Sequence, residues 1–276
     1  MRQKKIKIKG KEISYYETRD DGNPVVLVHG MSSSSSVFIR QLIDSVLSYQ
    51  FRFIALDLLG HGNSEHSENP KSDYTLKGLA DFLVDFNDEL SLSDAVYVGH
   101  NLGGNILLEA SKKLKNPKGF VLLGSSPLPK PFNMDPFRKN LPLELFSKPG
   151  IDDSEVHQIA SYFVEEDTKY PDFIPEIIRK SDHKTREVLF DSIQKGEYQD
   201  QIEIIKNIQL PVAVYHGEYD QMIDFDFLKN IDIPDMWRDI IQVIRDSGQL
   251  FFYECPADFN VSFETFLFTI FNKKKT

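Results

Sequence analysis

The sequence predicts an α/β protein with a doubly wound, mostly parallel sheet. Short apolar runs rich in β-branched residues alternate with longer segments whose apolar residues recur at helical spacing. Continuously apolar strands indicate a sheet that is buried on both faces, which is typical of parallel strands connected by helices. A chain of 276 residues with 41% hydrophobic content is long enough to bury such a core.

The first element departs from the parallel pattern. Residues 4–18 are expected to form an antiparallel hairpin, because strand-like runs flank a turn at Gly10. The later strands share short apolar runs, and we expect them over 24–30, 51–57, 94–98, 119–124, 212–215 and 239–244. We expect helices where apolar residues recur at helical spacing or where a residue favoured at a helix N-terminus begins the segment. These segments are 37–47, 76–90, 105–110, 153–165, 171–180, 184–195 and 256–271.

The strand pattern stops between residues 125 and 207, where only helical segments are expected. We therefore predict a helical lid over 125–207, inserted into one core domain that comprises 1–124 and 208–276. The last helix begins at Pro256, a residue favoured at helix starts, and its many phenylalanines predict packing against the sheet.

Composition and charge narrow the classes of function. A net charge of −10 and a pI near 5.2 argue against a nucleic-acid-binding surface or a polybasic membrane anchor. No segment is long enough to span a bilayer, and the N-terminus does not resemble a secretory signal. With Cys255 as the only cysteine, we expect a soluble cytoplasmic protein. No metal-ligand cluster or phosphate-binding loop is present, so we expect no cofactor and a small-molecule partner.

Residues 99–103, Gly-His-Asn-Leu-Gly, have the spacing of the G-x-S-x-G nucleophile elbow. An apolar strand precedes them and a helix follows, which is the context that this motif requires. Asn101 stands where the serine would be. A carboxamide is a poor nucleophile, because its nitrogen lone pair is delocalised and it has no proton that a histidine could remove at neutral pH. Asparagine does tolerate the left-handed backbone conformation, so Asn101 would preserve the turn without the chemistry.

Other motifs follow in a fixed order along the chain. His29-Gly30 comes directly after a strand, and residues 57–64 form a D-x-x-G-x-G-x-S stretch. Together with the elbow, these motifs make the chain similar to the α/β-hydrolase family over nearly its whole length. The family carries its acid after a later strand, where this chain has Asp220, and its base in a closing S-G-H motif. Here residues 247–249 read Ser-Gly-Gln, and none of the seven histidines lies beyond His216.

This resemblance implies a role for each residue of the site. The positions of nucleophile, base and acid fall on Asn101, Gln249 and Asp220. The oxyanion donors would be the backbone N–H groups of Met31 and Leu102, and the residues beside them would be His29, Gly30 and His100. Two interpretations of Asp220 remain open, a hydrogen bond to the Gln249 amide or direct contact with a ligand.

Asn101 in place of the serine and Gln249 in place of the histidine both argue against ordinary hydrolysis. Asn101 is a poor nucleophile, and Gln249 cannot accept and pass on a proton near pH 7. The resemblance therefore implies a relative of small-molecule ester and carbonyl hydrolases that is a ligand-binding pseudo-hydrolase or a lyase-like or cyclase-like catalyst without a nucleophile. The alternative is an active hydrolase whose residues were substituted for trapping. It would be of the serine type, or of the aspartate type found in dehalogenases and epoxide hydrolases. Leu102 and Ser32 favour the serine type, since the aspartate branches usually carry Trp and Pro there.

Overall fold

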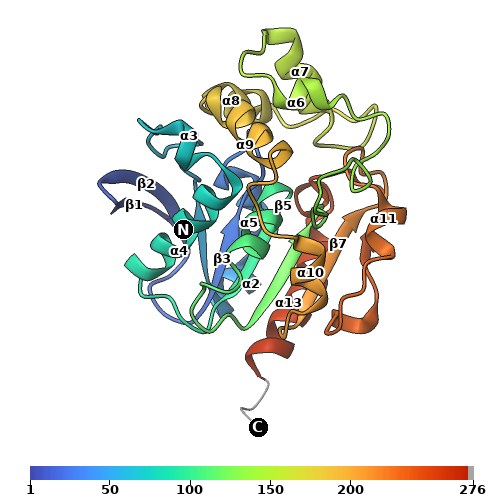
Figure 1. Cartoon of the computed structure of the whole chain (residues 1–276). Helices are drawn as coiled ribbons and strands as arrows, with labels where there is room; N and C mark the ends of the chain where they lie inside the picture. Colours follow the sequence, from blue (N-terminus) through green and yellow to red (C-terminus); the bar gives the residue numbers. More distant parts are fainter. Residues whose placement is uncertain (273–276) are drawn as a thin grey trace.

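The fold is an eight-stranded sheet with helices on both faces, as a computed structural model shows for residues 1–272 (Figure 1). The strands lie in the order β1-β2-β4-β3-β5-β6-β7-β8. Strand β2 pairs antiparallel with β1 and β4, and all other pairs are parallel. The predicted fold class is therefore confirmed. The strands are β1 (Arg2–Ile8), β2 (Lys11–Glu17), β3 (Asn23–Val28), β4 (Phe51–Leu56), β5 (Val96–His100), β6 (Gly119–Leu123), β7 (Val212–Gly217) and β8 (Gln242–Ile244).

Two helical layers cover the sheet. One layer contains α4, α5 and α10, and the other contains α1, α2, α12 and α13. The helices are α1 (Ile39–Leu42), α2 (Ser45–Gln50), α3 (Pro70–Asp73), α4 (Leu76–Glu89), α5 (Leu102–Ala110), α6 (Leu143–Ser147), α7 (Asp153–Ser161), α8 (Phe173–Lys180), α9 (Lys184–Gln194), α10 (Gln201–Lys206), α11 (Phe225–Lys229), α12 (Phe251–Glu254) and α13 (Pro256–Phe271), with 3-10 turns η1 (Ser35–Phe38) and η2 (Trp237–Asp239). No helix among residues 1–272 is long and apolar enough to cross a membrane.

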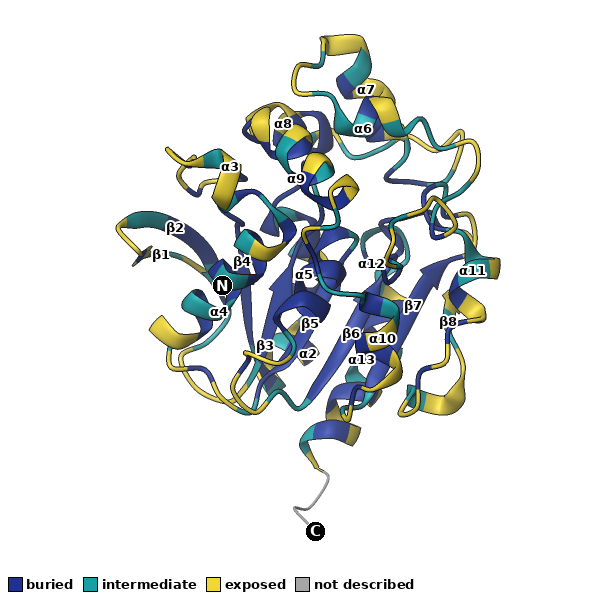
Figure 2. Ribbon diagram, viewed as in Figure 1, coloured by how far each residue is buried: buried dark blue, intermediate teal, exposed yellow. Residues whose placement is uncertain are grey.

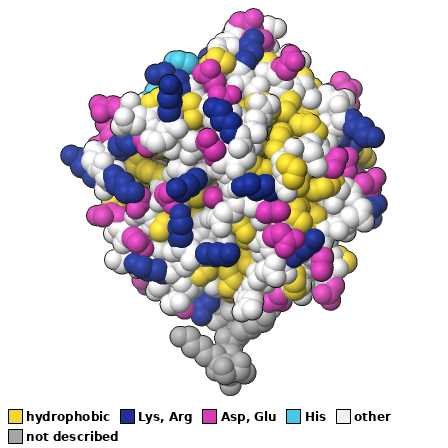
Figure 3. Space-filling view, viewed as in Figure 1, with side chains coloured by type: hydrophobic (Ala, Val, Ile, Leu, Met, Phe, Trp, Pro, Cys, Tyr) yellow, Lys and Arg dark blue, Asp and Glu magenta, His cyan; other side chains and the backbone are white. Residues whose placement is uncertain are grey.

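The core lies on both sides of the central strands. Every residue of β5, β6 and β7 is buried, which explains why these strands read as continuous apolar runs (Figure 2). Helix α13 begins at Pro256 as predicted and buries Phe259, Phe263 and Phe266. On the face that Figure 3 shows, acidic and basic side chains are interspersed among smaller apolar areas.

The segment between β6 and β7 contains α6 to α10. In Figure 1, α6, α7, α8 and α9 lie above the carboxyl ends of the central strands. This group is held to the sheet domain at Asp182, whose N–H donates to the Gly60 carbonyl at 2.7 Å and whose carboxylate accepts from the Tyr74 hydroxyl at 2.8 Å. The three helices expected here are present as α7, α8 and α9. Helices α6 and α10 were not predicted, because five or six residues show too little periodicity to be recognised.

Other boundaries differ from the sequence prediction. The amphipathic segment 37–47 is divided among η1, α1 and α2, because Asp44 starts a new helix by accepting from the N–H groups of Val46 and Leu47, both at 2.9 Å. The last strand was expected from residue 239 but begins at Gln242, since Arg238 and Asp239 adopt φ values of 62° and 56° and interrupt the extended backbone.

Glycines allow α5 to pack directly on the sheet. A Cβ added at Gly103 would lie 2.2 Å from the Val28 carbonyl oxygen, and one added at Gly99 would lie 2.4 Å from the Gly104 nitrogen. Side chains at these positions would push the helix away from β3 and β5. The glycines of the 99–103 motif therefore fix how closely the start of α5 approaches the strand ends.

We predict that Gly103→Ala lowers the free energy of unfolding by about 1–3 kcal/mol, the usual cost of forcing extra volume into a packed interior. Helix propensity alone would favour alanine, so a loss must come from the clash with Val28. Chemical denaturation measures the change. The matched control is Gly150→Ala, because a Cβ there meets nothing within 4 Å. Equal stability of the two variants would contradict this account of the packing.

Candidate active site

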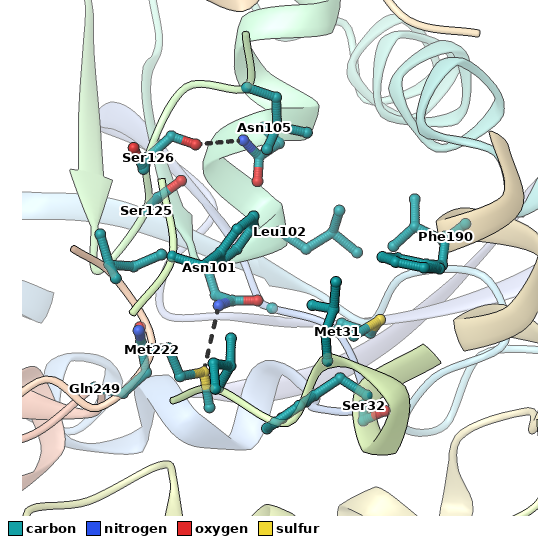
Figure 4. Close-up of a pocket in the computed structure, with 18 of the residues that line it drawn as sticks. Met31, Ser32, Asn101, Leu102, Asn105, Ser125, Ser126, Phe190, Met222 and Gln249 are labelled. Atoms are coloured by element: carbon teal, nitrogen blue, oxygen red, sulfur yellow. Dashed lines mark hydrogen bonds between the residues drawn. The ribbon is translucent and has the colours of Figure 1, made fainter. Parts of the chain in front are cut away.

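Asn101 occupies the turn between β5 and α5. Its backbone has φ 50° and ψ −118°, which confirms the left-handed turn predicted for the elbow. The turn is held by the Asn101 N–H, which donates to the Leu123 carbonyl at 3.0 Å, and by the Gly104 N–H, which donates to the Asn101 carbonyl at 3.0 Å. The side-chain amide is directed toward Met222, with Nδ2 3.8 Å from Sδ (Figure 4).

Gln249 is bonded to Asp220. Its amide nitrogen donates to both carboxylate oxygens, at 3.1 and 2.9 Å. The same carboxylate accepts from the backbone N–H groups of Met222 at 2.7 Å and Ile223 at 3.1 Å. Asp220 is completely buried and does not line the cavity described below. Of the two interpretations of Asp220, the structure therefore shows the hydrogen bond to the amide.

The other end of the Gln249 amide contacts His100. A carboxylate only accepts hydrogen bonds, so the NH2 group of the amide must face Asp220 and its oxygen must face the histidine. The His100 Nε2 atom lies 3.0 Å from that oxygen and therefore donates to it. Burial lowers the pKa of His100 to about 4, so the ring is neutral at pH 7. Asp220, Gln249 and His100 thus form a hydrogen-bonded chain whose central member is a neutral amide.

Burial raises the pKa of the Asp220 carboxyl to about 6, although the N–H groups of Met222 and Ile223 act in the opposite direction. A second histidine, His216, lies behind this carboxylate, with Nδ1 3.7 Å from Oδ2. Burial lowers the pKa of His216 to about 4, so this ring is not a cationic partner at neutral pH. The negative charge of Asp220 is therefore stabilised by N–H donors.

The His29 ring is hydrogen-bonded only to the backbone. Its Nδ1 atom donates to the Gly30 carbonyl at 2.7 Å, and its Nε2 atom accepts from the Leu58 N–H at 3.0 Å. It does not line the cavity, and burial lowers its pKa to about 3. The ring of His100, in contrast, bonds to the Gln249 side chain.

The predicted oxyanion donors lie beside the elbow. Met31 and Leu102 both line the cavity, and neither backbone N–H donates to an acceptor within residues 1–272. Gly30 permits the close approach of the two loops, because a Cβ there would lie 2.8 Å from Cβ of Asn101. Two N–H groups without protein partners beside the elbow can donate to a carbonyl or anionic oxygen of a ligand.

A buried arginine holds the loop that contains Met31. The Arg186 guanidinium donates to the Ser32 hydroxyl oxygen at 3.2 Å, and to the carbonyls of Lys148 at 3.1 Å and Pro149 at 3.0 Å. The bond to Ser32 connects α9 to the loop after β3 that contains Met31, and the other two bonds connect α9 to the segment between α6 and α7. Burial lowers the pKa of Arg186 from its usual value, but arginine remains charged in proteins.

The cavity has a volume of about 100 Å³ and lies between the strand ends and the helices above them. Its walls are mainly apolar and include several aromatic residues of the segment between β6 and β7, namely Phe132, Phe137, Phe146, Phe163 and Phe190. The predicted site residues that line it are Gly30, Met31, His100, Asn101, Leu102 and Gln249. Figure 4 shows Asn101, Met31 and Leu102 facing this space, with Phe190 on its far side.

Sequence analysis missed several polar residues of the cavity, among them Asn105, Ser125 and Ser126. Two signals were available. Ser125 and Ser126 follow a predicted strand directly, and ligands bind beyond the carboxyl ends of parallel strands. Asn105 is a polar residue in a helix whose residues are all buried. Within residues 1–272, no group of three or more histidine, cysteine or acidic side chains is arranged to hold a metal ion.

The chain belongs to the family described as the alpha/beta hydrolase fold, because the family model matches residues 23–254. Among curated relatives, an uncharacterised protein of Mycobacterium tuberculosis is 32% identical over 88 residues, which are 32% of this chain and 24% of that protein. This chain therefore matches only about a quarter of that relative's length. A 2-hydroxy-6-oxo-6-(2'-aminophenyl)hexa-2,4-dienoic acid hydrolase of Metapseudomonas resinovorans is 28% identical over 91% of this chain and 85% of the enzyme.

A solved structure is similar over the whole chain. The N-acyl homoserine lactonase AidH, complexed with N-butanoyl homoserine, has a TM-score of 0.94 and 25% identity, and the match covers 100% of both chains. A serine-to-glycine mutant of that lactonase is complexed with N-hexanoyl homoserine lactone. It has a TM-score of 0.92 and 25% identity over 97% of this chain and 98% of that one.

The buried titratable groups predict how stability depends on pH. Burial lowers the pKa of His29 and His61 to about 3, and of His100 and His216 to about 4. An unfolded chain binds these protons near its ordinary histidine pKa of about 6.5, so it takes up protons before the folded protein does. Each histidine then costs up to about 1.4 kcal/mol of stability per pH unit as the pH falls below that value.

We predict that the free energy of unfolding falls steeply between about pH 6.5 and pH 4.5, as chemical denaturation can measure. Asp220 affects the free energy of unfolding in the opposite direction. Its pKa is about 6 in the folded protein and 3.8 ordinarily, so the folded protein binds this proton first and acidification favours the folded state. Asp220→Asn should therefore make the loss steeper. A free energy of unfolding that stays constant over this range would contradict the buried neutral state of the histidines.

Proposed function

We propose that this protein binds a small carbonyl compound with an apolar chain and does not hydrolyse it. The observation that carries the proposal is the Gln249 amide, which donates to Asp220 and accepts from His100 in place of a general base. Asn101 supplies a second amide at the nucleophile position. The backbone donors of Met31 and Leu102 are unaffected by either replacement, so binding and bond cleavage are separated at this site.

The proposed lack of hydrolysis follows from amide chemistry. Neither amide can attack a carbonyl carbon or transfer a proton near neutral pH. In serine hydrolases, removing triad members leaves roughly 10³ to 10⁴ of rate enhancement from the oxyanion hole and binding. A residual rate of that size is far below enzymatic turnover, so a bound ester or lactone would persist.

The chemistry of the cavity supports the proposed ligand class. Apolar and aromatic walls favour an alkyl or acyl chain, and the two N–H groups favour a carbonyl oxygen at its end. The similarity to AidH supports the same class, since a serine-to-glycine mutant of that lactonase is complexed with N-hexanoyl homoserine lactone. Here an asparagine stands where the family has its nucleophilic serine. We therefore take N-acyl homoserine lactones as the first compounds to test.

We further propose that residues 125–207 act as the lid of this site and that 1–124 and 208–276 form the core domain. The aromatic residues that this segment contributes to the cavity support this division. So does the buried Arg186, since its bond to Ser32 makes the position of α9 depend on the oxyanion loop. A ligand that orders the loop would in this way also order the helices above it.

We predict that N-hexanoyl homoserine lactone binds to the purified protein in isothermal titration calorimetry and is not turned over at an enzymatic rate. Mass spectrometry of the recovered compound should show ring opening no faster than the residual enhancement of roughly 10³ to 10⁴ over the rate in buffer. Leu143→Trp, which enlarges a residue lining the cavity, should weaken binding at least about tenfold by occupying the space of the acyl chain.

The matched control is Leu210→Trp, because Leu210 is also partly buried but lies outside the cavity. If the control keeps the affinity of the parent, and both variants have the circular dichroism spectrum of the parent, the weaker binding of Leu143→Trp results from the filled cavity. Rapid, protein-dependent ring opening would contradict the proposal. So would the absence of binding by this lactone and by hexanoyl esters.

A further inference from the structure

Asn105 presents only a hydrogen-bond acceptor to the cavity. Its Nδ2 group donates to the Ser126 carbonyl at 2.8 Å and to the Gln201 Oε1 atom at 2.8 Å, so both of its N–H groups are used. The Gln201 amide is itself fixed, because Oε1 also accepts from the Leu128 N–H at 3.1 Å and Nε2 donates to the Asn105 carbonyl at 3.0 Å. A flip of the Asn105 side-chain amide would break these bonds, so its orientation is fixed. The amide oxygen has no protein partner within residues 1–272.

Two serine hydroxyls beside Asn105 lack partners. Ser125 and Ser126 are 1% and 3% exposed, both line the cavity, and neither Oγ atom has a hydrogen-bond partner within residues 1–272. The Ser125 hydroxyl lies against α5, since a Cβ added at Gly104 would be 2.2 Å from its oxygen. A buried hydroxyl without a partner carries a free-energy cost, so a ligand that accepts from it gains affinity.

These groups lie one helical turn from the oxyanion donors. Asn105 follows Leu102 by three residues on α5, and residues three apart share a helix face with about 5–6 Å between their Cβ atoms. Figure 4 shows Asn105, Ser125 and Ser126 together on the side of the cavity opposite Met222 and Gln249. A ligand with its carbonyl at Met31 and Leu102 would therefore have Asn105 on the next turn of the same helix.

We infer that Asn105, Ser125 and Ser126 form a second polar subsite, which binds a secondary amide of the ligand. The Asn105 oxygen accepts from the amide N–H, and a serine hydroxyl donates to the amide carbonyl. This inference rests on the proposed function, and it narrows the ligand class from carbonyl compounds to carbonyl compounds that also carry a secondary amide. In an N-acyl homoserine lactone, the carbon that bears the acylamide is bonded directly to the lactone carbonyl carbon, so the amide lies close to the carbonyl that the Met31 and Leu102 N–H groups would bind.

The acceptor role is tested on the ligand, because replacing Asn105 would also break its bonds to Ser126 and Gln201. Calorimetric affinities are compared for N-hexanoyl homoserine lactone and its ester isostere, in which oxygen replaces the amide N–H. Both share the lactone, the acyl carbonyl and the chain. We expect the amide to bind at least about tenfold more tightly, since the ester leaves the Asn105 oxygen facing another oxygen.

The donor role is tested by Ser125→Ala with Ser126→Ala. The double variant should keep the stability of the parent, because these hydroxyls have no protein partner, and should weaken lactone binding several-fold. The matched control is Ser33→Ala, since the Ser33 hydroxyl is also buried without a partner but lies outside the cavity. An equal loss in the control would show a general effect on the loops and would overturn the donor role.

The outcomes separate this inference from the proposed function. Equal affinities for amide and ester would overturn the amide subsite while the proposed function stands. Binding of neither compound would overturn the proposed function itself. Tighter binding of the amide, with a loss in the Ser125 and Ser126 variant alone, supports both.

Discussion

The site depends on the backbone turn at Asn101. The left-handed conformation there reverses the chain between β5 and α5, and the glycines at 99 and 103 let the helix begin directly above the strand ends. This turn places Asn101 and Leu102, the first residue of α5, at the cavity that Met31 also lines. Asparagine tolerates a positive φ better than most other L-residues. An asparagine at position 101 therefore fits the turn, although its carboxamide is a poor nucleophile.

A neutral amide has a different electrostatic effect from a base. The imidazole of a hydrolase exchanges a proton with its nucleophile, whereas Gln249 has a fixed dipole whose positive end faces Asp220 and whose negative end faces His100. The three side chains remain connected across the strand ends without a mobile proton. This arrangement keeps Asp220 and His100 hydrogen-bonded to the same side chain.

The sequence predicted the sheet because its strands are local patterns of apolar residues. The spacing of residues 99–103 pointed to Asn101, and the resemblance of residues 247–249 to a closing S-G-H motif pointed to Gln249; both residues line the cavity. The sequence predicted neither α6 and α10, which are too short to show a period, nor the polar lining residues Asn105, Ser125 and Ser126. Asn105 is held by Gln201, 96 positions away, and Ser32 by Arg186, 154 positions away. Contacts of that kind arise from packing between helices, and no spacing rule in one sequence indicates them.

The most direct measurement restores both reactive groups, Asn101→Ser with Gln249→His, and follows hydrolysis of p-nitrophenyl esters. An imidazole at position 249 would have Asp220 as its acid, because the side-chain nitrogen there already lies 2.9 Å from the carboxylate. We predict that the rate rises at least roughly 10³-fold above the parent, while either single change has little effect. A folded double variant without activity would contradict the account, because the backbone frame would then not be that of a hydrolase.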